Sequence, residues 1–493
     1  MCLAVLFVLG LFYRSYPHLY LIPRWIIEEE VFAHAILELI RTGTTFRVGY
    51  QPVLEQYLLY FIYLLTHINP TTLSQYANPV IGALTVVPVY YVLRKISTQK
   101  EALVASALWT FNENMIYRSS TFNSTEALGL FFGLIALYTY LNYFGLKKYI
   151  LFLTFIILSI FTHVLPATFI IGVVSLDMFF KGNMRNKILT AISISLFVIF
   201  LYSPLNPNAV MMHSINPVVM LSQFNLSNIF LYSLSDLLLG VSVFLGSVIL
   251  VVLSFISIIL YKHNKLMLIY LFGCVSLFVV SWMVYSAYLI APTRTVIYFI
   301  LPLSYFSSIL ICKLKTKTTF ILGIILILTM SLTSLNGINT MLYVDNAMTI
   351  DEYEFLENSD IIKSTYNFGE WWTDMPLKSS LLLFSSNLKP TVLPDTFHVN
   401  DNKNIIVNLN STISTTITTT NIDGTIVITK VPPVYKYIIL SPRMEKSAFF
   451  FINTKYRTIQ VKQPLVDIWK DMSDWKLIEE YKNIKLYKWC GDV

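Results

Sequence analysis

The sequence predicts a polytopic α-helical membrane protein with about eleven transmembrane helices, followed by an extracytoplasmic α/β domain. Two observations carry this prediction. The 493 residues are 55% hydrophobic and only 13% charged, whereas soluble domains are roughly 25% charged. The chain also contains repeated apolar runs that approach the ~20 residues needed to span a bilayer as a helix. These features exclude an ordinary soluble enzyme, a nucleic-acid-binding module and a disordered chain.

Eleven apolar segments are predicted to cross the membrane as helices, because lipid offers no hydrogen-bond partner to free backbone groups. They are residues 1–13, 76–93, 102–117, 127–145, 149–163, 165–180, 188–203, 237–261, 266–288, 295–312 and 318–336. The first has no basic residues before it and no small-residue cleavage site, which favours a truncated first helix over a signal peptide. A further apolar run, 53–67, carries Glu55 and is interpreted as a helix that lies in the outer interface of the membrane.

The orientation follows from the positive-inside rule, by which cytoplasmic loops carry the excess of Lys and Arg. If 53–67 does not span, the basic clusters of the loops all fall on one side of the membrane. These clusters are Arg94, Lys95 and Lys100; Lys147 and Lys148; Lys181, Arg185 and Lys187; Lys262 and Lys265; and Lys313, Lys315 and Lys317. We therefore expect a multi-pass protein of the cytoplasmic membrane, with its N-terminus inside and its C-terminal domain outside.

Two domains are predicted. Residues 1–337 form the multispanning domain, whose first external loop, 14–75, carries interfacial helices, and residues 338–493 form the external domain. In the external domain we expect helices at 347–358 and 465–480. The Thr-, Ser- and Ile-rich stretch 411–420 favours an extended edge or a loop. Strands are expected at 380–385, 403–408, 425–430, 436–440 and 447–453.

The external side of the membrane domain is predicted to carry arginine but no lysine. The first 337 residues contain only ten acidic residues, and eight of these fall on or near this side. The guanidinium group of arginine binds phosphate through two parallel hydrogen bonds, which lysine cannot do. An acidic, arginine-rich face over an apolar body suits a lipid-linked phosphate or pyrophosphate, although ordinary loop decoration is the alternative. The external arginines are Arg14, Arg24, Arg41, Arg47, Arg118 and Arg294.

The first external loop holds three consecutive carboxylates, Glu28, Glu29 and Glu30, at the start of a segment with helical periodicity. Acidic side chains are stabilised at the start of a helix by its dipole, so helix capping is one interpretation. Three adjacent acids beside lipid are costly, however, and this membrane domain has few others. We therefore treat the three as candidate catalytic residues, with Glu30 also a candidate metal ligand.

Four further candidates are predicted on the same side. Glu126 stands just ahead of an apolar helix, either as a capping acid or as a catalytic or metal-binding partner of Glu30. Arg118 and Arg294 are candidate substrate-binding residues. Arg294 lies at a helix start, where the dipole does not favour a cation, so it requires an anionic partner. His163 separates two apolar helices and is either structural or a substrate ligand.

The C-terminal domain contains two adjacent tryptophans, Trp371 and Trp372, followed by Asp374. Sugar rings stack on indole faces while carboxylates accept hydrogen bonds from hydroxyls, so these three are candidate substrate-binding residues. Packing of the tryptophans in the core is an equal alternative. The four cysteines have neither framework nor zinc-site spacing, which indicates neither disulfides nor a cysteine-based metal site.

In the order of these features, the chain resembles the C-type (GT-C) glycosyltransferase superfamily, which includes protein mannosyltransferases and oligosaccharyltransferase catalytic subunits. The resemblance covers most of 1–340, and the ending 480–488 is similar to the closing strands of archaeal members. The segment Trp371-Trp372-Thr373-Asp374 resembles part of the Trp-Trp-Asp-Tyr-Gly signature of oligosaccharyltransferases. The matching features of the membrane domain are Glu30-x-x-x-His34, Tyr50-Gln51-Pro52, Arg118 with Glu126, and Arg294 with Pro302.

The resemblance implies an inverting glycosyltransferase that acts at the outer face of the membrane. Its donor would be a polyprenyl-phosphate-linked sugar, such as a dolichyl phosphate sugar, and its acceptor a protein or a glycan. It implies that Glu30 is the general base or a metal ligand, and that Glu126 orients the acceptor or the metal. Arg294 and Arg118 would stabilise the departing lipid phosphate. The resemblance leaves the cofactor as none or a divalent cation, Mn²⁺ or Mg²⁺.

Three alternatives stay open from the sequence: oligosaccharyltransferase-like protein glycosylation, a non-catalytic scaffold subunit, and a transporter or lipid flippase. Transporters place ionisable residues near the middle of the membrane. Here the polar groups cluster on one side and the interiors of the predicted spans are expected to be free of charge, which disfavours transport. A scaffold would place Glu30 and Arg294 far apart, whereas an enzyme would place them around one outward-facing cavity.

Overall fold

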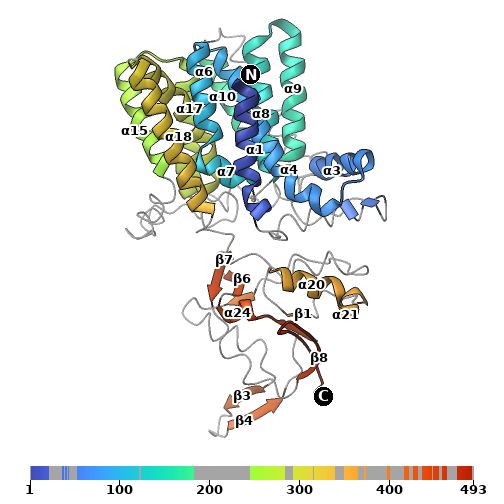
Figure 1. Ribbon diagram of the computed structural model, residues 1–493. Helices are drawn as coiled ribbons and strands as arrows, with labels where there is room; N and C mark the ends of the chain where they lie inside the picture. Colours follow the sequence, from blue (N-terminus) through green and yellow to red (C-terminus); the bar gives the residue numbers. More distant parts are fainter. Residues whose placement is uncertain are drawn as a thin grey trace. The chain divides into compact units, whose positions relative to one another are not determined.

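A computed structural model (Figure 1) shows a mostly helical protein with small sheets in its C-terminal part. Its elements fall into two compact units: helices α1 to α18 belong to the first, and the elements from α20 onward belong to the second. The structure describes residues 2–20, 36–37, 39–40, 43, 53–120, 124–181, 245–283, 292–314, 316–338, 349–364, 371–372, 397–399, 416–420, 426–430, 436–446, 448–454, 458–463 and 475–490.

The first unit is built from helices alone among its described residues. They are α1 (Cys2–Tyr20), α3 (Val53–Thr66), α4 (Pro70–Leu84), α5 (Val86–Arg94), α6 (Gln99–Thr110), α7 (Glu113–Ser120), α8 (Ser124–Asn142), α9 (Gly145–Thr162), α10 (Val164–Lys181), α15 (Leu245–Leu260), α16 (Lys265–Met283), α17 (Pro292–Lys313) and α18 (Thr316–Ile338). Large aromatic side chains such as Trp109, Tyr270, Tyr298 and Phe306 fill the core between them.

Several of these helices are suited to a membrane. Within the described residues, four are long and apolar enough to cross one: Thr72–Arg94, Gly145–Thr162, Val164–Lys181 and Thr295–Lys313. Shorter apolar helices are Cys2–Tyr16, Glu126–Asn142, Ser247–Leu260, Lys265–Val279 and Ile321–Thr333. Together they support a membrane protein, and its multi-pass topology stays a prediction. The number of eleven spans and the orientation stay predictions, and the predicted span 188–203 lies outside the described residues.

The predicted single span 102–117 is divided in two, so that prediction is wrong. Helix α6 ends at Thr110 and α7 begins at Glu113. Between them, Asn112 accepts hydrogen bonds at Oδ1 from the backbone N–H groups of Asn114 (3.0 Å) and Met115 (3.4 Å). Asparagine favours such a cap over a helix interior because its side chain competes for backbone groups. The cap starts a new helix where the hydropathy suggested a continuous one.

Helix α3 is a separate helix that lies crosswise to α1, α8 and α9 in Figure 1. It ends before His67, whose positive φ of 52° turns the chain into α4. One side of α3 buries Glu55 and Leu59, while Phe61 and Leu65 on the other side are exposed. The sequence predicted a helix here that lies in the membrane interface; the helix is present, and its position in the membrane stays a prediction.

Glu113 in α7 and Asp177 in α10, which fall within the predicted spans 102–117 and 165–180, are buried, contrary to the expectation that the spans carry no internal charge. Asp177 stands one turn before the end of α10, where Oδ1 lies 2.8 Å from Lys181 Nζ and Oδ2 accepts a hydrogen bond of 2.8 Å from Tyr140. Its charge is therefore compensated near a helix end rather than in the middle of the bundle.

The second unit combines short helices with three small sheets. The helices are α20 (Ile350–Asn358), α21 (Asp360–Ser364) and α24 (Pro442–Lys446). The strands are β1 (Trp371–Trp372), β2 (Phe397–Val399), β3 (Thr416–Thr420), β4 (Ile426–Lys430), β5 (Tyr437–Leu440), β6 (Ala448–Thr454), β7 (Thr458–Gln463), β8 (Trp475–Tyr481) and β9 (Ile484–Trp489). The sheet orders are β1-β5-β9-β8, β2-β6-β7 and β3-β4; β1–β5 and β2–β6 are parallel pairs and the others antiparallel.

Most predicted elements of this unit that fall on described residues are confirmed. The expected helix 347–358 corresponds to α20, and the strands expected at 425–430, 436–440 and 447–453 correspond to β4, β5 and β6. The expected extended edge at 411–420 contains β3. The helix expected at 465–480 is wrong from Trp475 onward, because this stretch is β8 and pairs with β9. The strands expected at 380–385 and 403–408 lie outside the described residues.

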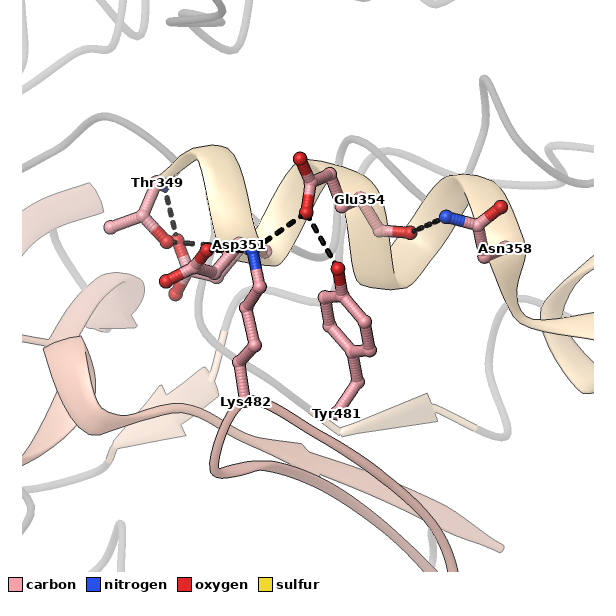
Figure 2. Close-up of polar contacts among 7 residues, drawn as sticks. Thr349, Asp351, Glu354, Asn358, Tyr481 and Lys482 are labelled. Carbon is pink, nitrogen blue, oxygen red and sulfur yellow. Dashed lines mark hydrogen bonds and ion pairs between the residues drawn. The ribbon is translucent and has the colours of Figure 1, made fainter.

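Helix α20 is held to the β8–β9 hairpin by an ionic contact shown in Figure 2. The hairpin turns at Lys482 and Asn483, whose φ angles of 48° and 66° match a two-residue turn of the type that suits twisted strands. Lys482 Nζ lies 2.8 Å from both Asp351 Oδ1 and Glu354 Oε2, and Tyr481 donates a hydrogen bond of 2.7 Å to Glu354 Oε2. Donation from Lys482 and then from Tyr481 lowers the pKa of Glu354, and the carboxylates raise the pKa of Lys482.

A second, buried contact joins α20 to α24 and to Ser441, the residue between β5 and α24. Glu352 forms a capping box with Thr349, and its carboxylate also accepts hydrogen bonds from Ser441 Oγ and from Arg443 Nε, the latter at 3.0 Å. The side chains of Glu352 and Arg443 are only 1% and 9% exposed. This pair therefore fixes α20 against the sheet from within the core of the unit.

Candidate functional site

The best-described part of the predicted site is the first turn of α8. It carries Glu126, whose side chain is fully buried. Gly129 and Gly133 lie three and seven positions further along, on the same side of the helix. A Cβ added at Gly129 would lie 2.9 Å from His163 Cβ, and one at Gly133 would lie 3.3 Å from Ile170 Cγ1. Glu126 therefore lies on the side of α8 that packs closely against the corner between α9 and α10.

His163 forms that corner. It ends α9 in an extended backbone conformation (φ −158°, ψ 123°), and its Nδ1 accepts a hydrogen bond of 3.3 Å from the backbone N–H of Leu165 in α10. In the neutral ring the proton is then on Nε2, which makes that atom a hydrogen-bond donor. Ser159 Oγ secures the corner by donating to the carbonyl of Gly129 at 2.7 Å. The structure thus places His163 beside the turn of α8 that follows Glu126.

Arg118 belongs to α7, and a buried arginine fixes this helix. Arg14 Nε donates a hydrogen bond of 2.7 Å to Ser119 Oγ, the residue next to Arg118. Arg14 Nη1 donates at 3.2 Å to the carbonyl of Thr110, the last residue of α6. A cation at the C-terminal end of a helix complements its dipole and its free carbonyls. The sequence predicted that Arg14 is one of the external arginines that suit a phosphate ligand. Its side chain is instead fully buried and joins α1, α6 and α7.

A polar cluster that the sequence interpretation missed lies at the start of α15. Glu113 accepts a hydrogen bond at Oε1 from the backbone N–H of Ser247, and the side-chain amides of Asn112 and Asn114 each donate at 2.9 Å to Ser247 Oγ. Glu113 is only 3% exposed, and its carboxylate faces the N-terminal end of α15, which the helix dipole makes positive. The sequence signal for this cluster is Asn112-Glu113-Asn114, a helix-cap pattern that lies within the predicted span 102–117.

The other predicted residues are described less fully. Arg294 lies in the first turn of α17, and its side chain, like that of Arg118, is outside the described part. Trp371 and Trp372 form β1, which pairs in parallel with Tyr437 and Ile438 of β5. Glu28, Glu29, Glu30 and Asp374 lie outside the described residues. A single site made by Glu30, Glu126 and Arg294 therefore stays a prediction.

Comparison with solved structures shows which known folds the chain resembles. The crystal structure of an Archaeoglobus fulgidus oligosaccharyltransferase, complexed with Zn and sulfate, aligns over 98% of this chain and 79% of that chain at 12% identity, with a TM-score of 0.59. The likeness shows a shared fold. A fold shared with an oligosaccharyltransferase agrees with the resemblance of the sequence to the GT-C superfamily.

Two further similar structures align less closely. ArnT from Cupriavidus metallidurans in the apo state aligns at 11% identity over 94% of this chain and 98% of that chain, with a TM-score of 0.49. The Archaeoglobus fulgidus oligosaccharyltransferase AglB, in complex with an inhibitory peptide and a dolichol-phosphate, aligns at 12% identity over 81% and 62%, with a TM-score of 0.47. No family model matches the sequence, and no curated protein sequence matches it significantly.

The residues present fit a divalent cation only in part. Among the described residues there is no group of three or more His, Cys, Asp or Glu side chains that could hold a metal ion. Glu126 offers carboxylate oxygens, which Mg²⁺ and Mn²⁺ prefer, and His163 lies near its helix face. The other predicted ligand, Glu30, lies outside the described residues. What the described geometry supplies is an acid and an imidazole at one end of the helical unit, suited to binding hydroxyls or a cation.

Proposed function

We propose that this protein is an inverting glycosyltransferase that moves a sugar from a polyprenyl-phosphate-linked donor to an acceptor at the outer face of the membrane. The observation that carries the proposal is the fold shared with an oligosaccharyltransferase over 98% of the chain at a TM-score of 0.59. The apolar helices support a lipid-linked substrate, because they place the chain in the membrane where such a donor resides. The packing of His163 against Gly129, one helical turn after Glu126, supports a polar site at one end of these helices.

The proposed chemistry assigns one step to each group. Glu30 removes the proton of an acceptor hydroxyl, whose oxygen attacks the anomeric carbon of the sugar from the side opposite the phosphate. The bond between sugar and phosphate breaks, and the polyprenyl phosphate leaves with the negative charge. Arg294 and Arg118 stabilise this charge by charge-assisted hydrogen bonds. A divalent cation, when bound, would supply further stabilisation of the phosphate oxygens.

The remaining predicted residues would bind and orient the substrates. Glu126 would hold the acceptor hydroxyl or the cation, and Nε2–H of His163 would donate to a substrate oxygen. Glu28 and Glu29 would complete the acidic first loop. Trp371, Trp372 and Asp374 would bind a sugar, through stacking on indole and through hydrogen bonds to the carboxylate.

The test is donor turnover in membranes that contain the full chain. A panel of labelled polyprenyl-phosphate sugars is supplied with and without Mn²⁺ or Mg²⁺, and wild type is compared with Glu30→Gln. Loss of a catalytic base predicts a fall in rate of about 10²–10⁴-fold. The matched control is Glu101→Gln, because Glu101 is in the capping box of α6 and glutamine preserves such a cap. Equal rates for Glu30→Gln and Glu101→Gln would contradict the assigned role.

A second candidate is protein glycosylation of the oligosaccharyltransferase kind, favoured by the fold shared with the Archaeoglobus fulgidus oligosaccharyltransferase. The same assay separates the two, because labelled sugar then appears on protein rather than in the lipid fraction. A transporter is less favoured. Of the two residues that could have lined a path through the middle of the membrane, Asp177 pairs with Lys181 near a helix end and Glu101 caps α6. A scaffold subunit predicts that wild type consumes no donor.

A further inference from the structure

A lysine-rich surface lies at one end of the helical unit, away from the candidate site. Helix α8 runs from Glu126 in its first turn to Tyr140 in its last turn, ~21 Å along the helix axis. Only Tyr143 and Phe144 separate α8 from α9. Helix α9 begins at Gly145, whose positive φ of 60° suits a tight reversal of the chain. The first turn of α9 is thus held beside the last turn of α8.

The first turn of α9 carries two lysines that stand over tyrosine rings. Lys147 Nζ lies 4.7 Å from the centre of the Tyr143 ring, and Lys148 Nζ lies 3.6 Å from the centre of the Tyr140 ring. Such cation–π contacts hold the ammonium groups in place without neutralising their charge. Among the described residues, the ion pairs include neither lysine. In this part of the chain, both lysines therefore keep a positive charge that an anion can bind.

A third lysine, Lys181, joins this surface from the end of α10. Its Nζ lies 2.8 Å from Asp177 Oδ1. Asp177 Oδ2 accepts a hydrogen bond of 2.8 Å from the hydroxyl of Tyr140, the residue whose ring lies under Lys148. Asp177 is the only acidic residue in the sequences of α9 and α10. The three lysines therefore share one carboxylate, which leaves this surface with an excess of two positive charges.

The helices place these lysines at the level of lipid head groups. Helices α9 and α10 are each long and apolar enough to cross a membrane. Lys147 and Lys148 lie at the start of the first, and Lys181 lies at the end of the second. Beside them, Phe144 is 87% exposed and Phe180 is 71% exposed. Exposed aromatic side chains next to lysines at the ends of apolar helices are typical of the interface between lipid and water.

These features favour an anionic phospholipid over the other molecules found at a membrane surface. Helix stability alone does not account for Lys147 and Lys148, because the positive end of a helix dipole disfavours lysines and α9 has no acidic residue in its first turn. The phosphate of an anionic lipid supplies the missing negative charge, and its acyl chains can pack against Phe144 and Phe180. A zwitterionic lipid has no net charge, and a soluble anion has no apolar part that could contact the two phenylalanines.

We propose that Lys147, Lys148 and Lys181 bind the head group of an anionic phospholipid in the membrane leaflet at this end of the helices. In the predicted orientation this is the cytoplasmic leaflet, whose surface is negatively charged. The bound phosphate bridges the first turn of α9 and the end of α10, because the lysines come from both helices. Glu126 and His163 lie at the other ends of α8 and α9, so the inference does not depend on the proposed transfer reaction.

The test is native mass spectrometry of the purified full chain in detergent, titrated with phosphatidylglycerol or with phosphatidylcholine of the same acyl chains. Wild type should bind phosphatidylglycerol more tightly than phosphatidylcholine. The double variant Lys147→Gln, Lys148→Gln should lower the affinity for phosphatidylglycerol about 25-fold, because each lysine near the head groups contributes about fivefold. Its affinity for phosphatidylcholine should equal that of wild type, which shows that the variant is folded.

Two further double variants separate a lipid site from attraction by net charge. Lys476→Gln with Lys488→Gln removes the same charge from strands β8 and β9 of the second unit, where the two lysines are cross-strand partners. This variant should bind phosphatidylglycerol as wild type does. Lys147→Arg with Lys148→Arg keeps the charge of the surface and should retain the binding.

Three results would overturn the proposal. Equal affinity of wild type for the two lipids would show that the lysines do not select an anionic head group. An equal loss of affinity in the variant of the second unit would assign the preference to net charge. Displacement of phosphatidylglycerol by an equal concentration of inorganic phosphate would identify a site for a soluble anion instead of a lipid.

Discussion

The contact between α4 and α7 provides the sharpest test of how the helical unit is packed. Gly82 of α4 is buried against Ser119 of α7, and a Cβ in its place would overlap Ser119 Cβ and Oγ and lie 2.9 Å from Arg14 Nε. Backbone-proximal atoms such as Ser119 Cβ cannot rotate away. Gly82→Ala must therefore separate the two helices and break the hydrogen bond of 2.7 Å between Arg14 and Ser119.

The expected loss of stability follows from three contributions. Overpacking costs about 1–3 kcal/mol, and loss of a hydrogen bond to a charged group costs about 1.5–3 kcal/mol. Alanine in place of glycine in a helix returns about 1 kcal/mol. The net expectation for Gly82→Ala is a destabilisation of about 1.5–5 kcal/mol. In Gly172→Ala, on α10, the new Cβ meets nothing within 4 Å, so only the gain of about 1 kcal/mol applies.

The assay is reversible SDS unfolding of both variants and wild type in detergent, followed by circular dichroism. Gly82→Ala should unfold at lower SDS than wild type, and Gly172→Ala at the same or higher SDS. If Gly82→Ala is as stable as Gly172→Ala, the two helices do not meet at Gly82 and the position assigned to α7 is wrong.

Two predictions concern the stability of the second unit. Both are measured by thermal unfolding of the full chain, with a spectroscopic probe of the tryptophans in the second unit. Glu352→Ala leaves the guanidinium of Arg443 buried without its carboxylate and should destabilise this unit by about 3–5 kcal/mol; an effect below about 1 kcal/mol would contradict the burial of the pair. Because the pKa of Glu354 is lowered in the folded state, its contribution is present above its ordinary pKa and is lost as the pH falls through the lowered value. Glu354→Gln should therefore weaken the acid dependence of unfolding, and an unchanged pH profile would refute the contact with Lys482.

The fold could be predicted well where one physical signal dominates. Long apolar runs predict the positions of α9, α10 and α17 because burial in lipid decides them. Hydropathy does not predict the break between α6 and α7, because it does not detect that the side chain of Asn112 caps a new helix. The strand β8 was missed for a different reason: its pairing with β9 depends on the turn at Lys482 and Asn483, and tertiary pairing overrides a local helical pattern.

The candidate site could be predicted in its residue types but not in its partners. The sequence predicted a role for Glu126 and for His163, but no local pattern indicated that His163 packs against Gly129, one turn after Glu126. It placed Arg14 with the external arginines because a charge after an apolar run suggests the end of a helix. Helix α1 continues past Arg14, however. The side chain of Arg14 donates hydrogen bonds to Thr110 of α6 and Ser119 of α7, which are about one hundred positions away in the sequence. Such long-range partners leave no local pattern in a sequence.

The buried charges of the helical unit differ in what accounts for them. Arg14 lies at the C-terminal end of α6 and Glu113 at the N-terminal end of α15, so each complements a helix dipole and is hydrogen-bonded to the backbone it stabilises. Their burial is therefore explained by structure alone. Glu55 is also fully buried, in the first turn of α3, where the dipole of its own helix favours a carboxylate. The buried charges therefore differ in which helix end accounts for each one: the C-terminal end of α6 for Arg14, the N-terminal end of α15 for Glu113 and that of α3 for Glu55.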